Sequence, residues 1–148
     1  STLKTWSEGA HSTEIRGGLS NFHPKYYSEN TKEEYMFDMS GKSILALCIK
    51  EIPKMFKEFL ENNKMKVSDI DMAVPHQASV AMPIVMQKLG VAKGKFIDEV
   101  KEFGNMVSAS VPMTLAHGLE QQKIKNGDII LLTGTAAGLT TNMMLIKI

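Results

Sequence analysis

The sequence is poor in the residues that mark disulfide-rich, membrane-spanning and nucleic-acid-binding proteins. Its 148 residues include one cysteine, Cys48, which excludes an internal disulfide and suits a reducing compartment, so we expect a cytoplasmic protein. The formal net charge is +1, and we therefore expect no nucleic-acid partner. No apolar run approaches the length of a membrane span, and no signal peptide opens the chain, so we expect no membrane association.

Patterns that bind metals or phosphates are also missing. The four histidines, His11, His23, His76 and His117, have no ligand spacing, and we expect no metal site. The small-residue stretch Gly134–Gly138 lacks the lysine of a phosphate-binding loop and does not open a helix. Cys48 falls on an apolar helical stripe without a basic neighbour, which favours a core cysteine over a nucleophile.

The length and the hydrophobic content, 148 residues and 43%, are those of one globular domain. The chain begins at Ser1 without a methionine, and residues 3–6 already look like a strand. We therefore expect a fragment or a processed piece. Residues 13–38 carry irregular signals, which predict a long surface excursion with a short extended piece at 35–37.

The clearest helix is predicted from Leu45 to Leu60, where apolar residues recur with a 3.6-residue period. Ser40 is a candidate N-cap, and Pro53 should kink the helix or cost about 3 kcal/mol. Asn62 and Asn63 end the pattern. We expect this helix to be heavily buried.

The stretch from Asp71 to Ser79 predicts a buried strand, a histidine at its carboxyl end, and then a helix closed by Gly90. Pro75 removes a ladder donor, so strand pairing should stop just before His76. Ligands bind at that end of the strands in open α/β sheets. One interpretation makes His76 catalytic. The other makes it a buried structural histidine bonded to a backbone carbonyl.

The second half of the chain predicts a short strand at 95–100, a turn at Gly104 and Asn105, a helix from 107 to 119, and a final hairpin. The hairpin strands are expected at 128–133 and 140–148, joined by a five-residue loop. The order β-α-β-α-β-α-β-β predicts an α/β fold with a mostly parallel sheet and an antiparallel edge pair. Three loop positions, His76, Asn105 and Gly134–Gly138, each follow a strand and could converge.

Four motifs carry a family resemblance. They are VPHQA from Val74, FGNMVSASVP from Phe103, GTAAGLT from Gly134 and YMFDMSGKSI from Tyr35. In this order the chain resembles the C-terminal half of the thiolase-like condensing enzymes, closest to β-ketoacyl-acyl-carrier-protein synthase III. The resemblance implies an α/β half with a five-stranded mixed sheet and helices on both faces. It also implies that residues 1–148 are one domain, that a cysteine-bearing N-terminal half is absent, and that the full-length enzyme is a homodimer.

The chemistry implied by the resemblance is a decarboxylative Claisen condensation of an acyl-CoA with malonyl-acyl carrier protein in fatty acid biosynthesis. His76 and Asn105 match the donors that hold the enolate oxygen. Ala137, within Ala136–Gly138, matches a backbone donor to the acyl oxyanion. The implied substrate channel comprises Gly41, Lys42, Leu45, Gln77, Ala78 and Ser79. No cofactor is implied, because coenzyme A and carrier-protein thioesters are the substrates.

The sequence departs from the family pattern at two places. Ser79 and Ala81 stand where the typical synthase has asparagine and an arginine that faces coenzyme A or the carrier protein. Ala136 and Ala137 stand in a loop that is normally all glycine. A related acyltransferase of secondary metabolism, a thioesterase-like or decarboxylating member, and a stand-alone non-catalytic dimerisation or binding module therefore remain alternatives. If the catalytic interpretation is right, His76 Nε2 and the Asn105 amide nitrogen should lie within roughly 6 Å of each other.

Overall fold

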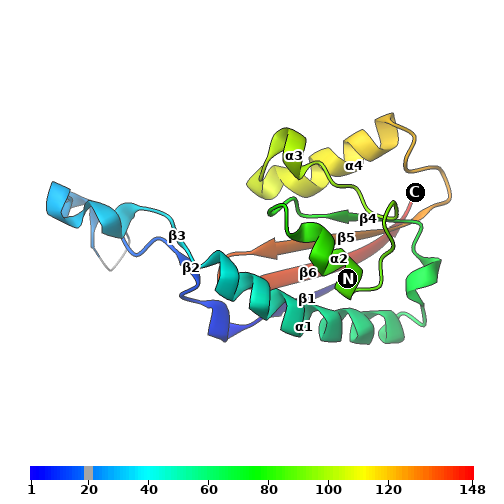
Figure 1. Ribbon diagram of the computed structural model, residues 1–148, viewed down its shortest axis with the longest axis horizontal. Helices are drawn as coiled ribbons and strands as arrows, with labels where there is room; N and C mark the ends of the chain where they lie inside the picture. Colours follow the sequence, from blue (N-terminus) through cyan, green and yellow to red (C-terminus); the bar gives the residue numbers. More distant parts are fainter. Residues whose placement is uncertain (19–21) are drawn as a thin grey trace.

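The computed structural model describes residues 1–18 and 22–148 and contains a mixed sheet with helices on both faces (Figure 1). In these residues the main sheet has four strands in the order β1-β6-β5-β4. Strands β4 and β5 are parallel, and the other two pairs are antiparallel. The strands are β1 (Thr2–Thr5), β4 (Met72–Pro75), β5 (Ile129–Ala136) and β6 (Thr140–Lys147). The predicted α/β fold is confirmed. The sheet is not mostly parallel, however, and the β5–β6 hairpin is not an edge pair, because β1 lies outside β6.

The fifth strand, predicted at 95–100, is reduced in the described residues to a single parallel bridge between Ala73 and Phe96. Ala73 N–H donates to the Lys95 carbonyl at 2.8 Å, and Ile97 N–H donates to the Ala73 carbonyl at 3.1 Å. The next ladder donor would be the residue at position 75, which is proline and has no N–H. The missing donor explains why the strand stops after one bridge.

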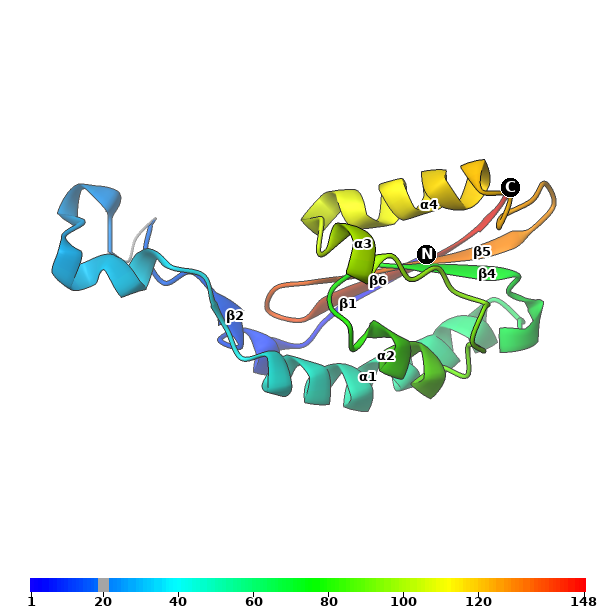
Figure 2. The ribbon, with the colours of Figure 1, turned by 45° about the horizontal axis from the view of Figure 1, so that its top comes forward.

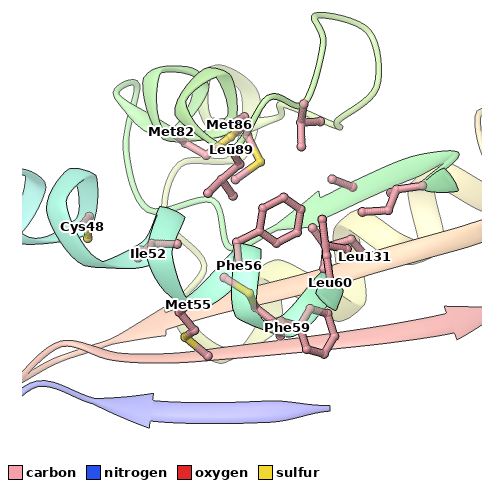
Figure 3. Close-up of a cluster of buried hydrophobic side chains, with 14 of the residues drawn as sticks. Cys48, Ile52, Met55, Phe56, Phe59, Leu60, Met82, Met86, Leu89 and Leu131 are labelled. Atoms are coloured by element: carbon pink, nitrogen blue, oxygen red, sulfur yellow. The ribbon is translucent and has the colours of Figure 1, made fainter. Parts of the chain in front are cut away.

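Helices α1 (Gly41–Asn62) and α2 (Met82–Lys88) cover one face of the sheet (Figure 2). Helices α3 (Val100–Phe103) and α4 (Ser110–Glu120) lie on the other. Figure 3 shows the core on the first face, where the apolar stripe of α1 meets α2 and Leu131 of β5. Burial of this amphipathic stripe stabilises α1, which continues through Pro53.

The start of α1 differs from the prediction in two respects. Ser40 occupies the N-cap position, but its hydroxyl pairs with Ser43 Oγ at 2.8 Å and makes no capping bond to the backbone. The first turn is exposed at Gly41 and Lys42 and only half-buried at Leu45. Full burial begins at Cys48, so the helix is heavily buried along its middle and end but not at its beginning.

The predicted surface excursion is an arm that projects from the end of the sheet (Figure 1). Its base is a two-stranded pair of β2 (Thr13–Glu14) and β3 (Asp38–Met39), so the extended piece lies just after the predicted residues 35–37. Between them are two 3₁₀ helices, Pro24–Tyr26 and Glu29–Tyr35, while residues 19–21 lie outside the described residues. Arg16 Nε lies 3.1 Å from a Glu34 carboxylate oxygen and links the two sides.

The final hairpin is tighter than predicted. The β5–β6 ladder continues to the Ala136–Thr140 pair, so Gly134 and Thr135 belong to β5 and the loop is Ala137–Leu139. Leu139 is fully buried, and its carbonyl accepts the Trp6 N–H at 3.0 Å. This anchor holds the loop against the beginning of the chain.

No helix in the described part of the chain is long and apolar enough to cross a membrane.

Candidate functional site

His76 is held at the carboxyl end of β4. Its backbone N–H donates to the Thr133 carbonyl of β5 at 2.7 Å, and its carbonyl accepts the Ala78 N–H at 2.9 Å. The side chain is half-buried, and burial lowers the pKa of the imidazole below its ordinary 6.5. Among the described residues no group hydrogen bonds the ring. A neutral imidazole with ring nitrogens available is therefore presented at the strand end.

Asn105 follows α3 and the positive-φ residue Gly104 (φ 68°). Its Nδ2 donates to the Ala78 carbonyl at 3.3 Å, and its Oδ1 accepts the Val107 N–H at 2.9 Å. The side chain thus tethers its own loop to the turn that carries His76. An amide nitrogen has two hydrogens, so one remains for a ligand after the bond to Ala78.

A cavity of about 320 Å³ opens beside His76. It lies at the carboxyl end of β5, where Ala136 and Gly134 form part of its wall, and Val107 approaches from the loop before α4. The remaining lining residues come from β1, β5, β6, the 3₁₀ turn before α4 and the start of α4: Leu3, Thr135, Thr140, Asn142, Ser108 and Val111. Asn105 and Ala137 do not line it. The cavity meets the sheet edge at which α/β folds bind ligands.

The hairpin loop offers a backbone donor next to this cavity. Ala136 and Ala137 are exposed, and Gly138 turns the chain with a φ of 71°. Within the described residues the Ala137 N–H has no hydrogen-bond acceptor. An N–H in that state can donate a hydrogen bond to a bound oxyanion.

Gln77 does not face a substrate channel, and that prediction is wrong. Its side chain is fully buried and makes hydrogen bonds to backbone groups of three residues, Pro75, Ile97 and Glu99. Successive residues of an extended chain point to opposite sides, so when His76 faces the cavity Gln77 points away from it.

The other predicted channel residues lie at two separate places. Ala78 and Ser79 are exposed and directly follow the His76 turn. Gly41, Lys42 and Leu45 begin α1, and none of them lines the 320 Å³ cavity. Their assignment to a substrate channel stays a prediction.

Sequence reasoning missed the wall of the cavity formed by the sheet. Thr140 and Asn142 of β6 and Leu3 of β1, which pairs with Asn142, line it. The sequence alone could have placed Thr140 and Asn142 on the same face, since residues two apart on a strand point to one side of the sheet. Val107 was also missed as a site residue, because the prediction placed it within a helix. It has a φ of 51° and precedes α4.

Two other features lie apart from this site. A second cavity, of about 340 Å³, is lined by residues of α1, the end of α2 and the segment between α1 and β4, and it contains none of the predicted site residues. Cys48 is buried, and burial raises the pKa of its thiol, which disfavours the reactive thiolate. The described residues contain no group of three side chains suited to hold a metal ion.

The matching family model and two curated relatives name the same family. A sequence model described as "3-Oxoacyl-[acyl-carrier-protein (ACP)] synthase III C terminal" matches residues 60–148. The β-ketoacyl-[acyl-carrier-protein] synthase III of Clostridium perfringens is 33% identical over 132 residues, which are 88% of this chain and 40% of that protein. The crystal structure of the 3-oxoacyl-(acyl carrier protein) synthase III of Pseudomonas aeruginosa superposes with a TM-score of 0.81 at 25% identity, covering 99% of this chain and 42% of the other.

The chain thus spans about two fifths of the length of the curated relatives that it matches. The synthase III of Aquifex aeolicus is 28% identical, and the matched region is 42% of that protein. The thiolase-like fold predicted from the motifs is confirmed by these structural similarities.

Proposed function

Because the chain belongs to the family of the C-terminal domain of 3-oxoacyl-[acyl-carrier-protein] synthase III, we propose that it is the C-terminal catalytic half of such an acyltransferase. The proposed reaction joins an acyl group from coenzyme A to malonyl-acyl carrier protein in fatty acid biosynthesis. One observation carries the proposal. A half-buried imidazole with an available ring nitrogen and a tethered carboxamide lie on adjacent loops, joined through Ala78.

The proposed step begins with a malonyl thioester bound beside His76. When its terminal carboxylate leaves as carbon dioxide, the electron pair of the broken bond moves into an enolate, and negative charge develops on the thioester oxygen. His76 Nε2–H and an Asn105 Nδ2–H donate to that oxygen. Loss of one such donor typically costs about 3 kcal/mol, or roughly a hundredfold in rate.

A neutral imidazole suits this role. The lowered pKa of His76 keeps the ring uncharged near neutral pH, where it still has one N–H to donate. The enolate carbon then attacks an acyl group held as a thioester on a cysteine of the first half. The Ala137 N–H donates to the oxygen of the tetrahedral intermediate, and the intermediate collapses by expelling the cysteine thiolate. These steps require no cofactor beyond the thioester substrates themselves.

We also propose that a cysteine-bearing N-terminal domain covers the α4 face of the sheet. Helix α4 packs on β4 and β5, while on β6 and β1 the side chains of Met144 and Leu3 remain 39% and 64% exposed. Val107, beside the same cavity, is 73% exposed. Exposed apolar side chains grouped around a catalytic cavity indicate a surface that another domain covers. The complete enzyme is proposed to be a cytoplasmic homodimer.

The test uses the complete enzyme and separates its two half-reactions. His76→Ala and Asn105→Ala should each lower malonyl decarboxylation by roughly a hundredfold and leave acylation of the cysteine largely intact. His11→Ala is the matched control, because the His11 side chain is 90% exposed and, among residues 1–18 and 22–148, pairs only with Glu14. Normal decarboxylation in the His76 variant would refute the role assigned to this residue.

A related acyltransferase of secondary metabolism is a second candidate. Ala81, where the typical synthase has an arginine, precedes the first residue of α2, so the basic contact that this arginine would make to coenzyme A or the carrier protein is missing there. Turnover of malonyl-CoA and of malonyl-acyl carrier protein by the same preparation distinguishes the two. A preference for the free coenzyme A thioester favours the second candidate.

A further inference from the structure

The parallel pairing beside β4 is interrupted where a proline stands in the ladder. Ala73 exchanges two backbone hydrogen bonds with the facing segment, through Lys95 and Ile97. In a parallel ladder the next bond would run from the N–H of residue 75 to the Ile97 carbonyl. Pro75 cannot donate, so that carbonyl needs another partner.

The side-chain amide of Gln77 provides the missing bonds. Its Nε2 donates to the Ile97 carbonyl at 3.1 Å and to the Pro75 carbonyl at 2.9 Å. Its Oε1 accepts the Glu99 N–H at 2.8 Å. Both amide hydrogens and the amide oxygen are therefore used, and the side chain is fully buried. The carboxamide thus takes the place of a peptide group between the end of β4 and the segment 97–99.

These bonds join the two loops that carry the proposed donors. Gln77 directly follows His76. Glu99 directly precedes α3, and Gly104 joins the end of α3 to Asn105. A second hydrogen bond links the same two segments, because Asn105 Nδ2 donates to the Ala78 carbonyl at 3.3 Å. The segments 76–78 and 99–105 thus form a closed ring that is fastened at two points, once by Gln77 and once by Asn105.

We propose that Gln77 is a positioning residue that sets the separation between His76 and Asn105. This inference rests on the proposed function of those two residues. Gln77 touches no substrate; it acts by fixing the backbone on both sides of the oxyanion site. A mismatch of a few tenths of an ångström between two donors weakens their hold on one shared oxygen, so the effect should fall on the step in which that oxygen is charged.

Glutamine suits this position because the three facing groups are two carbonyls and one N–H. Glutamate has the same shape, but its ionised form donates no hydrogen bond and would face the Pro75 and Ile97 carbonyls with a negative charge. When protonated it regains one donor. Gln77→Glu is therefore a near-isosteric variant whose defect depends on pH.

The experiment compares both half-reactions of the complete enzyme at about pH 6 and about pH 8.5. Between these two pH values a buried glutamate is expected to lose its proton. In Gln77→Glu, decarboxylation relative to wild type should fall roughly tenfold or more at the higher pH and recover partly at the lower pH. Cysteine acylation should change less than about threefold, since it does not use the shared oxygen. An effect of equal size on both half-reactions, or one without pH dependence, overturns the proposal.

Two control variants separate positioning from general damage. Gln121→Glu makes the same chemical change at an exposed residue after α4 and should behave like wild type at both pH values. Phe59→Leu weakens the core on the opposite face, where Phe59 is 4% exposed, and lowers stability without touching the ring of segments 76–78 and 99–105. A selective loss of decarboxylation in Phe59→Leu would mean that instability alone explains the Gln77 result.

A structural readout keeps this test independent of the proposed reaction. In crystals of wild type and Gln77→Glu grown at the higher pH, the separation of His76 Nε2 and Asn105 Nδ2 should differ by about 0.5 Å or more. An unchanged separation overturns the positioning role. A wild type that does not decarboxylate malonyl thioesters contradicts the proposed function instead, and the crystal comparison then decides the role of Gln77 alone.

Discussion

Val107 carries backbone strain next to the cavity beside His76, and relieving it should stabilise the chain. Its φ of 51° lies in the left-handed region, which costs an L-residue about 1–2 kcal/mol and is least suited to a β-branched side chain. The side chain is 73% exposed, so replacing it removes only about 0.5 kcal/mol of the burial energy of a valine. Val107→Asn, which tolerates this conformation, should therefore raise the free energy of unfolding by about 1 kcal/mol.

The assay is equilibrium unfolding in urea together with thermal unfolding. A gain of about 1 kcal/mol corresponds to a rise of roughly 3 °C in Tm for a chain of this size. Val107→Gly should gain less than Val107→Asn, because glycine adds about 0.5–1 kcal/mol of unfolded-state entropy. Val107→Ile is the matched control, since it keeps the β-branch and hence the strain.

The bond from the Val107 N–H to Asn105 Oδ1, at 2.9 Å, involves only the backbone of residue 107 and should survive all three substitutions. Strain at Val107 is contradicted if Val107→Asn destabilises the chain, or if Val107→Ile stabilises it as much as Val107→Asn does.

Three further predictions concern residues on and near the sheet. Cys48, 7% exposed and with a raised pKa, should react with iodoacetamide at least about tenfold more slowly in the folded chain than after unfolding; equal rates would contradict its burial. Gly118→Ala places a Cβ 2.6 Å from Ile97 Cδ1 and 2.8 Å from Ile124 Cδ1. The overpacking cost of about 1–3 kcal/mol should exceed the gain of about 1 kcal/mol in helix propensity, so the urea midpoint should fall rather than rise. For His76, the lowered folded-state pKa means that the unfolded chain takes up protons more readily as the pH falls below 6.5. Wild type should therefore lose stability in that range more steeply than His76→Gln, and parallel pH profiles of the two would contradict the lowered pKa.

The elements that sequence reasoning predicted correctly are those with strong local signals. The 3.6-residue stripe of α1 continues through Pro53, and the run before Pro75 forms β4 as predicted. Pro75 correctly marked the end of pairing on the Phe96 side, where its missing N–H leaves a single bridge. On the β5 side Pro75 still pairs with Thr133, and the His76 N–H donates to the Thr133 carbonyl. The final hairpin was also recognisable, although its loop is shorter than the small residues suggested.

The features that sequence reasoning missed depend on contacts between distant residues. The strand predicted around Phe96 has suitable residues, but the facing position is Pro75, so the Gln77 side chain replaces the ladder there. The motif that places His76 beside Gln77 does not by itself show which of the two faces the cavity. The tether from Asn105 to Ala78 spans 27 residues and depends on how α3 packs, which local patterns do not contain.

The most direct test of the central claim is a crystal structure of the complete enzyme with a non-hydrolysable malonyl thioester analogue. We expect one thioester oxygen within about 2.7–3.1 Å of both His76 Nε2 and Asn105 Nδ2, with the Ala137 N–H facing the acylated cysteine. An analogue bound with that oxygen in contact with neither side chain, and with His76 bonded instead to a protein carbonyl, would contradict the claim that His76 and Asn105 form one oxyanion site.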